Sequence, residues 1–309
     1  MLIIKLIKQI KQFGSIINSS PQLLFGAIGA GILLFVMIFA PFITNFDPHH
    51  FGTNPLSPLM TNGHILGSTH LGQDVFAMVI FGTRTSLMVA LISGFISGGL
   101  GIIVGALAGF FGGALDKILS EIINVFMMIP ALLLIILVVA LFGGSIVNVM
   151  IVIGLTTWPG NARLMRAQAM SFRERTFVKS AYAMGENRAQ MLFKYIIPNG
   201  MFPVIANTTL GMAGAVLAEA GLSFLGLGDT SVISWGQMIE SGRLFITTAW
   251  WTTTFGGLAI VFTIIVFNLL GDGLNHVLNP KILNPKHSNI ELPAKKKLHF
   301  NWKRYSERV

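Results

Sequence analysis

Long apolar runs separated by polar segments make up most of this chain. A helix that crosses a membrane needs about 20 consecutive apolar residues, because the hydrocarbon core of a bilayer is about 30 Å thick. The pattern therefore predicts an all-α, polytopic membrane protein with six transmembrane helices. The predicted spans are 23–43, 86–108, 118–142, 146–164, 202–225 and 251–270.

Polar or basic segments flank and interrupt this transmembrane domain, which we place at 21–280. Residues 1–20 put apolar side chains and lysines on different helical faces, the pattern of an amphipathic helix that lies on anionic lipid. Residues 44–84 are rich in Pro, Asn, Gly and His, and we expect an exposed loop that leads into a re-entrant or elbow segment from 71–76. Residues 281–309 form a basic tail.

Composition and charge support a membrane protein and give its orientation. The chain is 53% hydrophobic and 11% charged, whereas about a quarter of the residues in ordinary soluble domains are charged. With both termini in the cytoplasm, only Arg84 and Arg243 of the 21 basic residues fall outside, as the positive-inside rule requires. The net charge of +9 is thus a topology signal. Nucleic-acid binding is disfavoured, because no aromatic-interleaved groove accompanies the basic residues.

One polar, basic segment, 165–198, lies between two apolar runs and is typical of a surface that contacts another protein. Ser171 followed by Glu174 matches a capping box, and Gly185 suits the left-handed turn that ends a helix. We therefore expect a helix over 172–184, after which Pro198 marks where the chain turns back towards the membrane.

The chain has no Gly-Lys dipeptide, so it lacks the phosphate-binding loop G-x-x-x-x-G-K-[ST]. If ATP drives this protein, another chain binds it.

At this segment the sequence resembles the EAA loop of binding-protein-dependent ABC importer permeases. The spacing to Gly185 and Pro198 fits, while Lys179 stands where the family usually has Glu and Ser180 where it has Ala. Other segments are similar to the second permease of the dipeptide, oligopeptide and nickel importers, and the resemblance runs from about residue 22 to 281. They are LGQDVF at 71–76, WPGNAR at 158–163, LAEAGLSFLGLG at 217–228, SWG at 234–236, NLLGDGL at 268–274 and NP at 279–280.

This resemblance implies a type I permease fold in a bacterial or archaeal plasma membrane. It implies four kinds of partner: a homologous second permease, two cytoplasmic ATPases that hold ATP and Mg²⁺, an extracytoplasmic solute-binding protein, and a peptide or, alternatively, nickel or a metal chelate as substrate. The chain itself would catalyse nothing and bind no cofactor. The residues expected to couple it to the ATPase are Phe177, Lys179, Ala181, Met184, Gly185 and Pro198, with Phe177, Ala181 and Met184 on one exposed helical face.

Several polar or helix-breaking residues inside the spans are candidates for a translocation pathway or a hinge. Glu219, near Ser223, is either a pathway or interface acid, since a charge in lipid is costly, or a buried carboxylate that Ser and Thr neighbours satisfy. Asn124 and Pro130 are expected to kink the third span, and Pro159 to break the fourth.

Two rival functions rest on other residues. The string Gly226 to Asp229 matches the GxGD motif of intramembrane aspartyl proteases, but that chemistry needs a second aspartate and none is evident. A free-standing secondary transporter is the third alternative.

The outer-loop histidines could serve a nickel importer as ligands, but their spacing fits no metal motif, so we interpret them as ordinary loop residues. They are His49, His50, His64 and His70.

Overall fold

The fold is described by a computed structural model for residues 20–278. The amphipathic segment predicted at 1–20, apart from Ser20, and the basic tail predicted at 281–309 lie outside the described residues.

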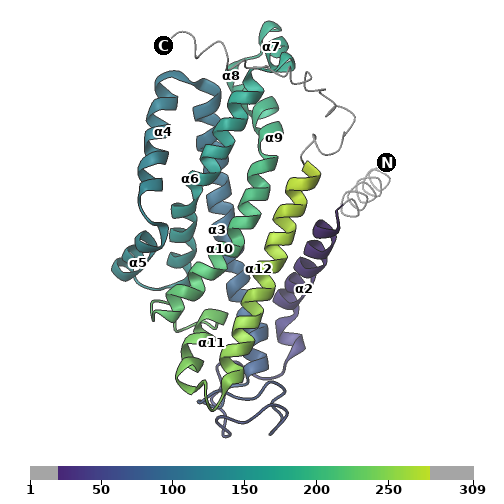
Figure 1. Cartoon of the computed structure of the whole chain (residues 1–309), viewed down its shortest axis with the longest axis vertical. Coiled ribbons are helices and arrows are strands. Elements are labelled where there is room, and N and C mark those ends of the chain that lie inside the picture. Colours follow the sequence, from purple (N-terminus) through teal and green to yellow (C-terminus); the bar gives the residue numbers. More distant parts are fainter. Residues whose placement is uncertain (1–19, 279–309) are drawn as a thin grey trace, which may run out of the picture. The chain divides into compact units, whose positions relative to one another are not determined.

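The described part of the chain is helical and has no β-strand (Figure 1). Its longer helices are α2 (Pro21–Ile43), α3 (Val75–Phe111), α4 (Gly113–Met128), α5 (Ala131–Phe142), α6 (Ile146–Arg173), α10 (Phe202–Phe224) and α12 (Trp250–Leu278). The shorter ones are α7 (Thr176–Ala183), α8 (Arg188–Met191), α9 (Ile197–Gly200) and α11 (Trp235–Gly242), with a π-helical turn at Leu192–Ile196 and a 3₁₀ turn at Arg243–Phe245.

Each predicted span corresponds to helix, but the count of six is not confirmed. Four helices, α2, α3, α10 and α12, are long and apolar enough to cross a membrane. The pair α4 and α5 would make a fifth span, broken by an 83° bend. The helix α6 is not among these, and its second half carries Arg163, Arg166 and Arg173.

The bend between α4 and α5 confirms the expected kink near Pro130. Ile129 has an extended backbone, and Pro130 is the residue that precedes α5. Proline disfavours a helical conformation at the residue before it, so α4 stops there. By contrast, α6 passes through Pro159 without a break, so the prediction of a broken fourth span was wrong. Pro159 is buried, and close packing of neighbouring elements around a membrane helix allows it to keep such a proline.

The start of α3 also differs from the prediction. Residues 75–84 are the first turns of one continuous helix and form no separate elbow. Asp74 is the N-cap, and its Oδ1 accepts a hydrogen bond from the N–H of Ala77 at 2.7 Å. This cap starts the helix well before the apolar run that we took as the span.

A stripe of glycines joins α3 to α6. A Cβ atom on Gly105 or Gly109 would collide with the carbonyl oxygens of Ala162 or Arg166 on α6. Only glycine permits this approach of two helix backbones, as in the small-xxx-small spacing of membrane helix pairs.

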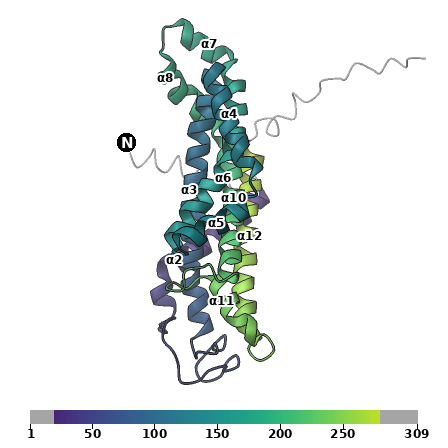
Figure 2. The same ribbon diagram turned by 90° about the vertical axis from the view of Figure 1, so that its left-hand side faces the viewer.

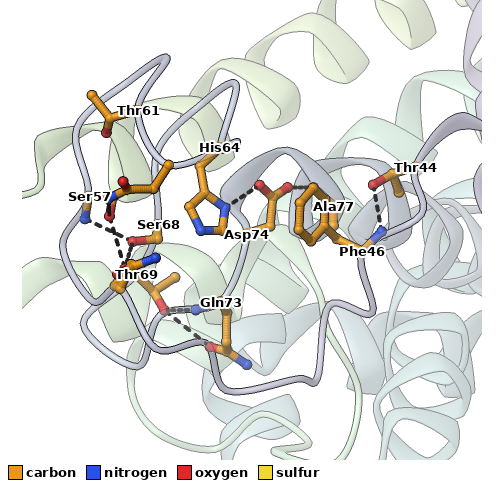
Figure 3. A network of polar contacts seen from close by, with 12 residues as sticks. Thr44, Phe46, Ser57, Thr61, His64, Ser68, Thr69, Gln73, Asp74 and Ala77 are labelled. Atoms are coloured by element: carbon orange, nitrogen blue, oxygen red, sulfur yellow. Dashed lines mark hydrogen bonds and ion pairs between the residues drawn. The ribbon is translucent and has the colours of Figure 1, made fainter.

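The two ends of the helical bundle carry different structures. The segment with α7 and α8 lies at one end, while α11 and the loop over 44–74 lie at the other (Figures 1 and 2). A buried polar network orders this loop, as Figure 3 shows. His64 Nδ1 lies 2.7 Å from Asp74 Oδ2, and the Ser57 N–H donates to Ser68 Oγ at 2.8 Å.

Candidate functional site

The coupling segment begins where α6 ends. The predicted capping box at Ser171 and Glu174 is absent, because α6 continues as helix through Arg173 and Glu174 becomes its C-cap. A capping box needs a non-helical N-cap residue, and Ser171 is held in the helix that Met165 and Ala169 anchor in the protein core. The helix expected over 172–184 is therefore the shorter α7.

The end of α7 at Gly185 is as expected. Gly185 has a φ of +88°. The N–H of Glu186 donates to the carbonyl of Ala181 at 3.2 Å, and the N–H of Gly185 donates to that of Tyr182 at 3.0 Å. These two bonds form a Schellman motif, which favours glycine at the left-handed position. A capping box does occur next, between Asn187 and Gln190 at the start of α8.

One face of α7 packs on the protein itself. Val178 and Ala181 are both buried, and Val178 belongs to a cluster that includes Phe110 of α3 and Met165 of α6. Ala181 is thus part of the core, and the expected exposed face of Phe177, Ala181 and Met184 is wrong for Ala181. The residues at i and i+3 from Val178 form the buried stripe, which turns position 181 inward.

Apolar side chains beside the buried stripe of α7 and at its C-cap are exposed. Phe177, Tyr182 and Met184 are 41, 63 and 75% exposed. Lys179 is also exposed, and its Nζ lies 3.1 Å from Glu174 Oε2. The segment therefore presents apolar side chains to the surroundings on a helix that Val178 joins to α3 and α6.

A polar clamp closes the loop behind α7. Glu186 Oε1 accepts hydrogen bonds from Lys194 Nζ and from the Tyr195 hydroxyl, each at 2.8 Å. The bond from Lys194, and next that from Tyr195, hold the pKa of Glu186 below its usual value. The same interactions raise the pKa of Lys194. Pro198 follows in the first turn of α9, where a missing N–H is tolerated.

Glu219 and Ser223 are buried within α10. Glu219 is 3% exposed, and its Oε1 accepts hydrogen bonds from the hydroxyls of Ser223 at 2.8 Å and Ser234 at 2.7 Å. Its Oε2 has no partner among the described residues. Ser234 also caps α11. For Oε1 the geometry therefore matches the interpretation of a buried carboxylate that serine neighbours satisfy. Through Ser234, Glu219 connects α10 to α11.

The other pathway candidates lie apart from Glu219. Asn124 on α4 is exposed, and its Oδ1 accepts a hydrogen bond from Arg163 Nη2 of α6 at 3.2 Å. Pro130 is exposed at the bend, and Pro159 is buried. The structure thus brings Glu219 and Ser223 together but does not bring them to the other three residues.

Two polar links between spans were missed by the sequence analysis. Asn161 donates to Ser97 Oγ at 3.0 Å and accepts from Asn207 Nδ2 at 2.9 Å, which connects α6 to α3 and α10. Asp116 of α4 forms a two-pronged ion pair with Arg166 of α6. Polar residues at these positions within or beside apolar runs were the available signal.

The loop residues behind the rival functions have structural contacts. Asp229 Oδ2 accepts the N–H of Ile146 at the start of α6 at 2.9 Å, and Oδ1 accepts the N–H of Ser231 at 3.0 Å. His64 pairs with Asp74, and His70 stacks on Phe245 with ring centroids 4.5 Å apart. Across residues 20–278, no three His, Asp or Glu side chains are grouped to hold a metal ion.

Comparison with known proteins shows the fold and the family. The fold is similar to a chain of the inward-facing MetNI methionine ABC transporter, with a TM-score of 0.52 and 18% identity over 65% of this chain and 96% of that chain. Residues 101–284 match the family model described as "Binding-protein-dependent transport system inner membrane component".

The particular relatives are permeases. The chain is 35% identical to the dipeptide transport system permease protein DppC of Alkalihalophilus pseudofirmus, over 81% of this chain and 82% of that protein. It is 32% identical to the glutathione transport system permease protein GsiD of Pectobacterium atrosepticum, over 83 and 87% of the two chains. The chain belongs to the family of binding-protein-dependent transport system inner membrane components.

Membership confirms the predicted importer permease with its ABC importer permease fold, a multi-pass protein of the plasma membrane. Permeases of this family are membrane subunits that work with an ATPase and a binding protein. The family match leaves the protease and secondary-transporter alternatives without support.

Proposed function

We propose that this chain is the permease subunit of an ATP-driven importer for di- or oligopeptides. The names of relatives with 32 to 35% identity support this substrate class, since they include dipeptide and di/tripeptide transport permeases. The importer would also contain a homologous second permease, two ATPases that bind ATP and Mg²⁺, and an extracytoplasmic solute-binding protein. This chain would bind no cofactor and catalyse no reaction.

The single observation that carries the coupling role is the exposed apolar surface of α7 beside its buried stripe. Val178 packs with residues of α3 and α6. Phe177 and Tyr182, on either side of the stripe, and the C-cap Met184 are exposed. Exposed apolar side chains on a helix are typical of an interface with a partner groove. The ATPase would bind this face in the cytoplasm, with Lys179 and Glu174 at its edge. The opposite end, with the loop 44–74, would then face the solute-binding protein.

Nickel uptake has no comparable support among the described residues. Two of the outer-loop histidines are held by other side chains, His64 by Asp74 and His70 by Phe245.

The test is co-purification of the ATPase with tagged permease in detergent. Met184→Glu should release the ATPase, because it places a charge at the most exposed of these three apolar side chains. Gly185→Arg should do the same by straining the left-handed turn. Met60→Glu is the matched control, since Met60 is 78% exposed in the loop over 44–74. Retention of the ATPase by both α7 variants, or its absence with the wild type, would reject the coupling role.

A further inference from the structure

A large cavity lies at the end of the bundle opposite α7. It has a volume of about 870 Å³ and lies between the end of α2, the first turns of α3, the loop after α2 and residues 232–233. Cavities that bind small ligands commonly measure about 300 to 1,000 Å³. The side chains used in the argument below are Met37, Asp47, Phe81, Arg84 and Met88.

Arg84 is the cationic residue of this cavity. It lies in the third turn of α3, within a helix long and apolar enough to cross the membrane, and is half-buried. None of the ion pairs formed among residues 20–278 includes Arg84. The planar fork of donors on a guanidinium matches a carboxylate.

Asp47 supplies the opposite charge in the same cavity. Its Oδ1 accepts the N–H of His49 at 2.9 Å, which fixes the carboxylate on the loop after α2. The remaining wall is largely apolar and includes Phe81 and two methionines, Met37 and Met88. Methionine is flexible and polarisable, so it adapts to ligands of different shape.

We propose that this cavity receives the peptide on its way to the translocation pathway. Arg84 binds the peptide's C-terminal carboxylate and Asp47 its N-terminal ammonium. The methionines and Phe81 contact the variable side chains, which accounts for a site that holds a zwitterion without selecting its sequence. The inference rests on the proposed peptide importer and names a binding site within it.

The experiment measures uptake by the complete importer in proteoliposomes with a saturating binding protein. The probes are trialanine, trialanine amide and N-acetyl-trialanine. Because every variant meets the same binding protein, the preference of that protein cancels in the comparison. We expect Arg84→Gln to lower trialanine uptake by about tenfold, the loss expected for a hydrogen bond to a charged group, and to leave amide uptake unchanged.

Two further variants test the same geometry. Arg84→Lys should restore part of the preference for the free carboxylate, and Asp47→Asn should lower uptake of trialanine but leave N-acetyl-trialanine unchanged. Arg243→Gln is the matched control, because Arg243 is also at this end of the bundle but lies 3.6 Å from Glu240 and outside the cavity. It should behave as the wild type.

The outcomes separate the inference from the proposed function. If Arg84→Gln and Asp47→Asn reduce uptake of all three probes equally, or of none, while the wild type imports peptide, the cavity is not the peptide site. If the wild type imports none of the probes, the peptide importer itself is wrong. Should Arg84→Gln fail to assemble with the ATPase, the result for Asp47→Asn on the exposed loop decides.

Discussion

Single residues in this permease are fixed by contacts that reach across the membrane domain. Glu219 accepts two serine hydroxyls from different elements, Asp229 caps a helix that begins 83 residues earlier in the chain, and Asn161 joins three helices. Such bonds are strong where water is excluded, and loss of one partner leaves the other buried and unsatisfied.

Glu219 allows a test of this point. Glu219→Ala leaves the hydroxyls of Ser223 and Ser234 without their acceptor and opens a cavity, so we expect a loss of about 2 to 4 kcal/mol in the free energy of unfolding. Glu219→Gln keeps an acceptor oxygen and should lose about 1 kcal/mol or less. Thermal denaturation of the purified protein in detergent would show the difference. Equal losses would mean that the hydrogen bonds do not carry the effect.

Gly105 permits the close approach of α3 and α6. Gly105→Leu should destabilise the protein by about 1 to 3 kcal/mol, because its side chain would collide with the Ala162 carbonyl and Met165. Gly99 lies on the same helix with open space around it, so Gly99→Leu is the matched control. Melting temperatures of the two variants in the same detergent would check this. A similar melting temperature for both would contradict the close packing.

At the scale of elements, the segment after α7 depends on pH through the Glu186 clamp. The pKa of Glu186 is lowered in the folded protein, so its stabilising effect is present above the unfolded value of about 4.3 and is lost as the pH falls through the folded value. The pKa of Lys194 is raised in the folded protein, so the stabilising effect of Lys194 is present at neutral pH and is lost only in the alkaline range. Between about pH 5 and 10 the clamp should not change.

Amide hydrogen exchange in residues 186–195 measures how far this clamp orders the loop. Below about pH 4 the amides should lose protection in the wild type, whereas Glu186→Gln should show the same reduced protection at every pH. Comparing the wild type with Glu186→Gln at each pH cancels the pH dependence of the intrinsic exchange rate. Protection in the wild type that equals that of Glu186→Gln at neutral pH would show that the clamp does not order the loop.

How far the sequence predicts these elements depends on how local their causes are. The apolar runs and the left-handed Gly185 act within a few residues, and they predicted the helices and the end of α7 correctly, although the count of six spans was not confirmed. Ser171, Pro159 and Ala181 were misjudged because the extent of α6 and the buried side of α7 are not set by the local signal at these residues. The pairs Asp116 with Arg166 and Asn161 with Asn207 depend on which helices become neighbours, which no periodicity shows.

At the scale of the whole molecule, the orientation remains a prediction that can be measured. The chain has no cysteine, so a single cysteine can be introduced without first removing others from it. In intact cells, a membrane-impermeant maleimide should label Met60→Cys but not Met184→Cys, and opening the cells should expose the second site. Both residues are highly exposed. Labelling of both positions from the same side would contradict the positive-inside assignment.

The continuity of α6 has a mechanical consequence. Its 28 residues correspond to a rod about 42 Å long, which starts at the Asp229 cap and ends three residues before α7 begins. Because the helix is continuous through Pro159, a displacement at one end would be carried to the other. A tilt of about 10° would move the far end by about 7 Å. A partner that pulls on α7 would therefore also move the opposite end of α6, at the loop beside α11.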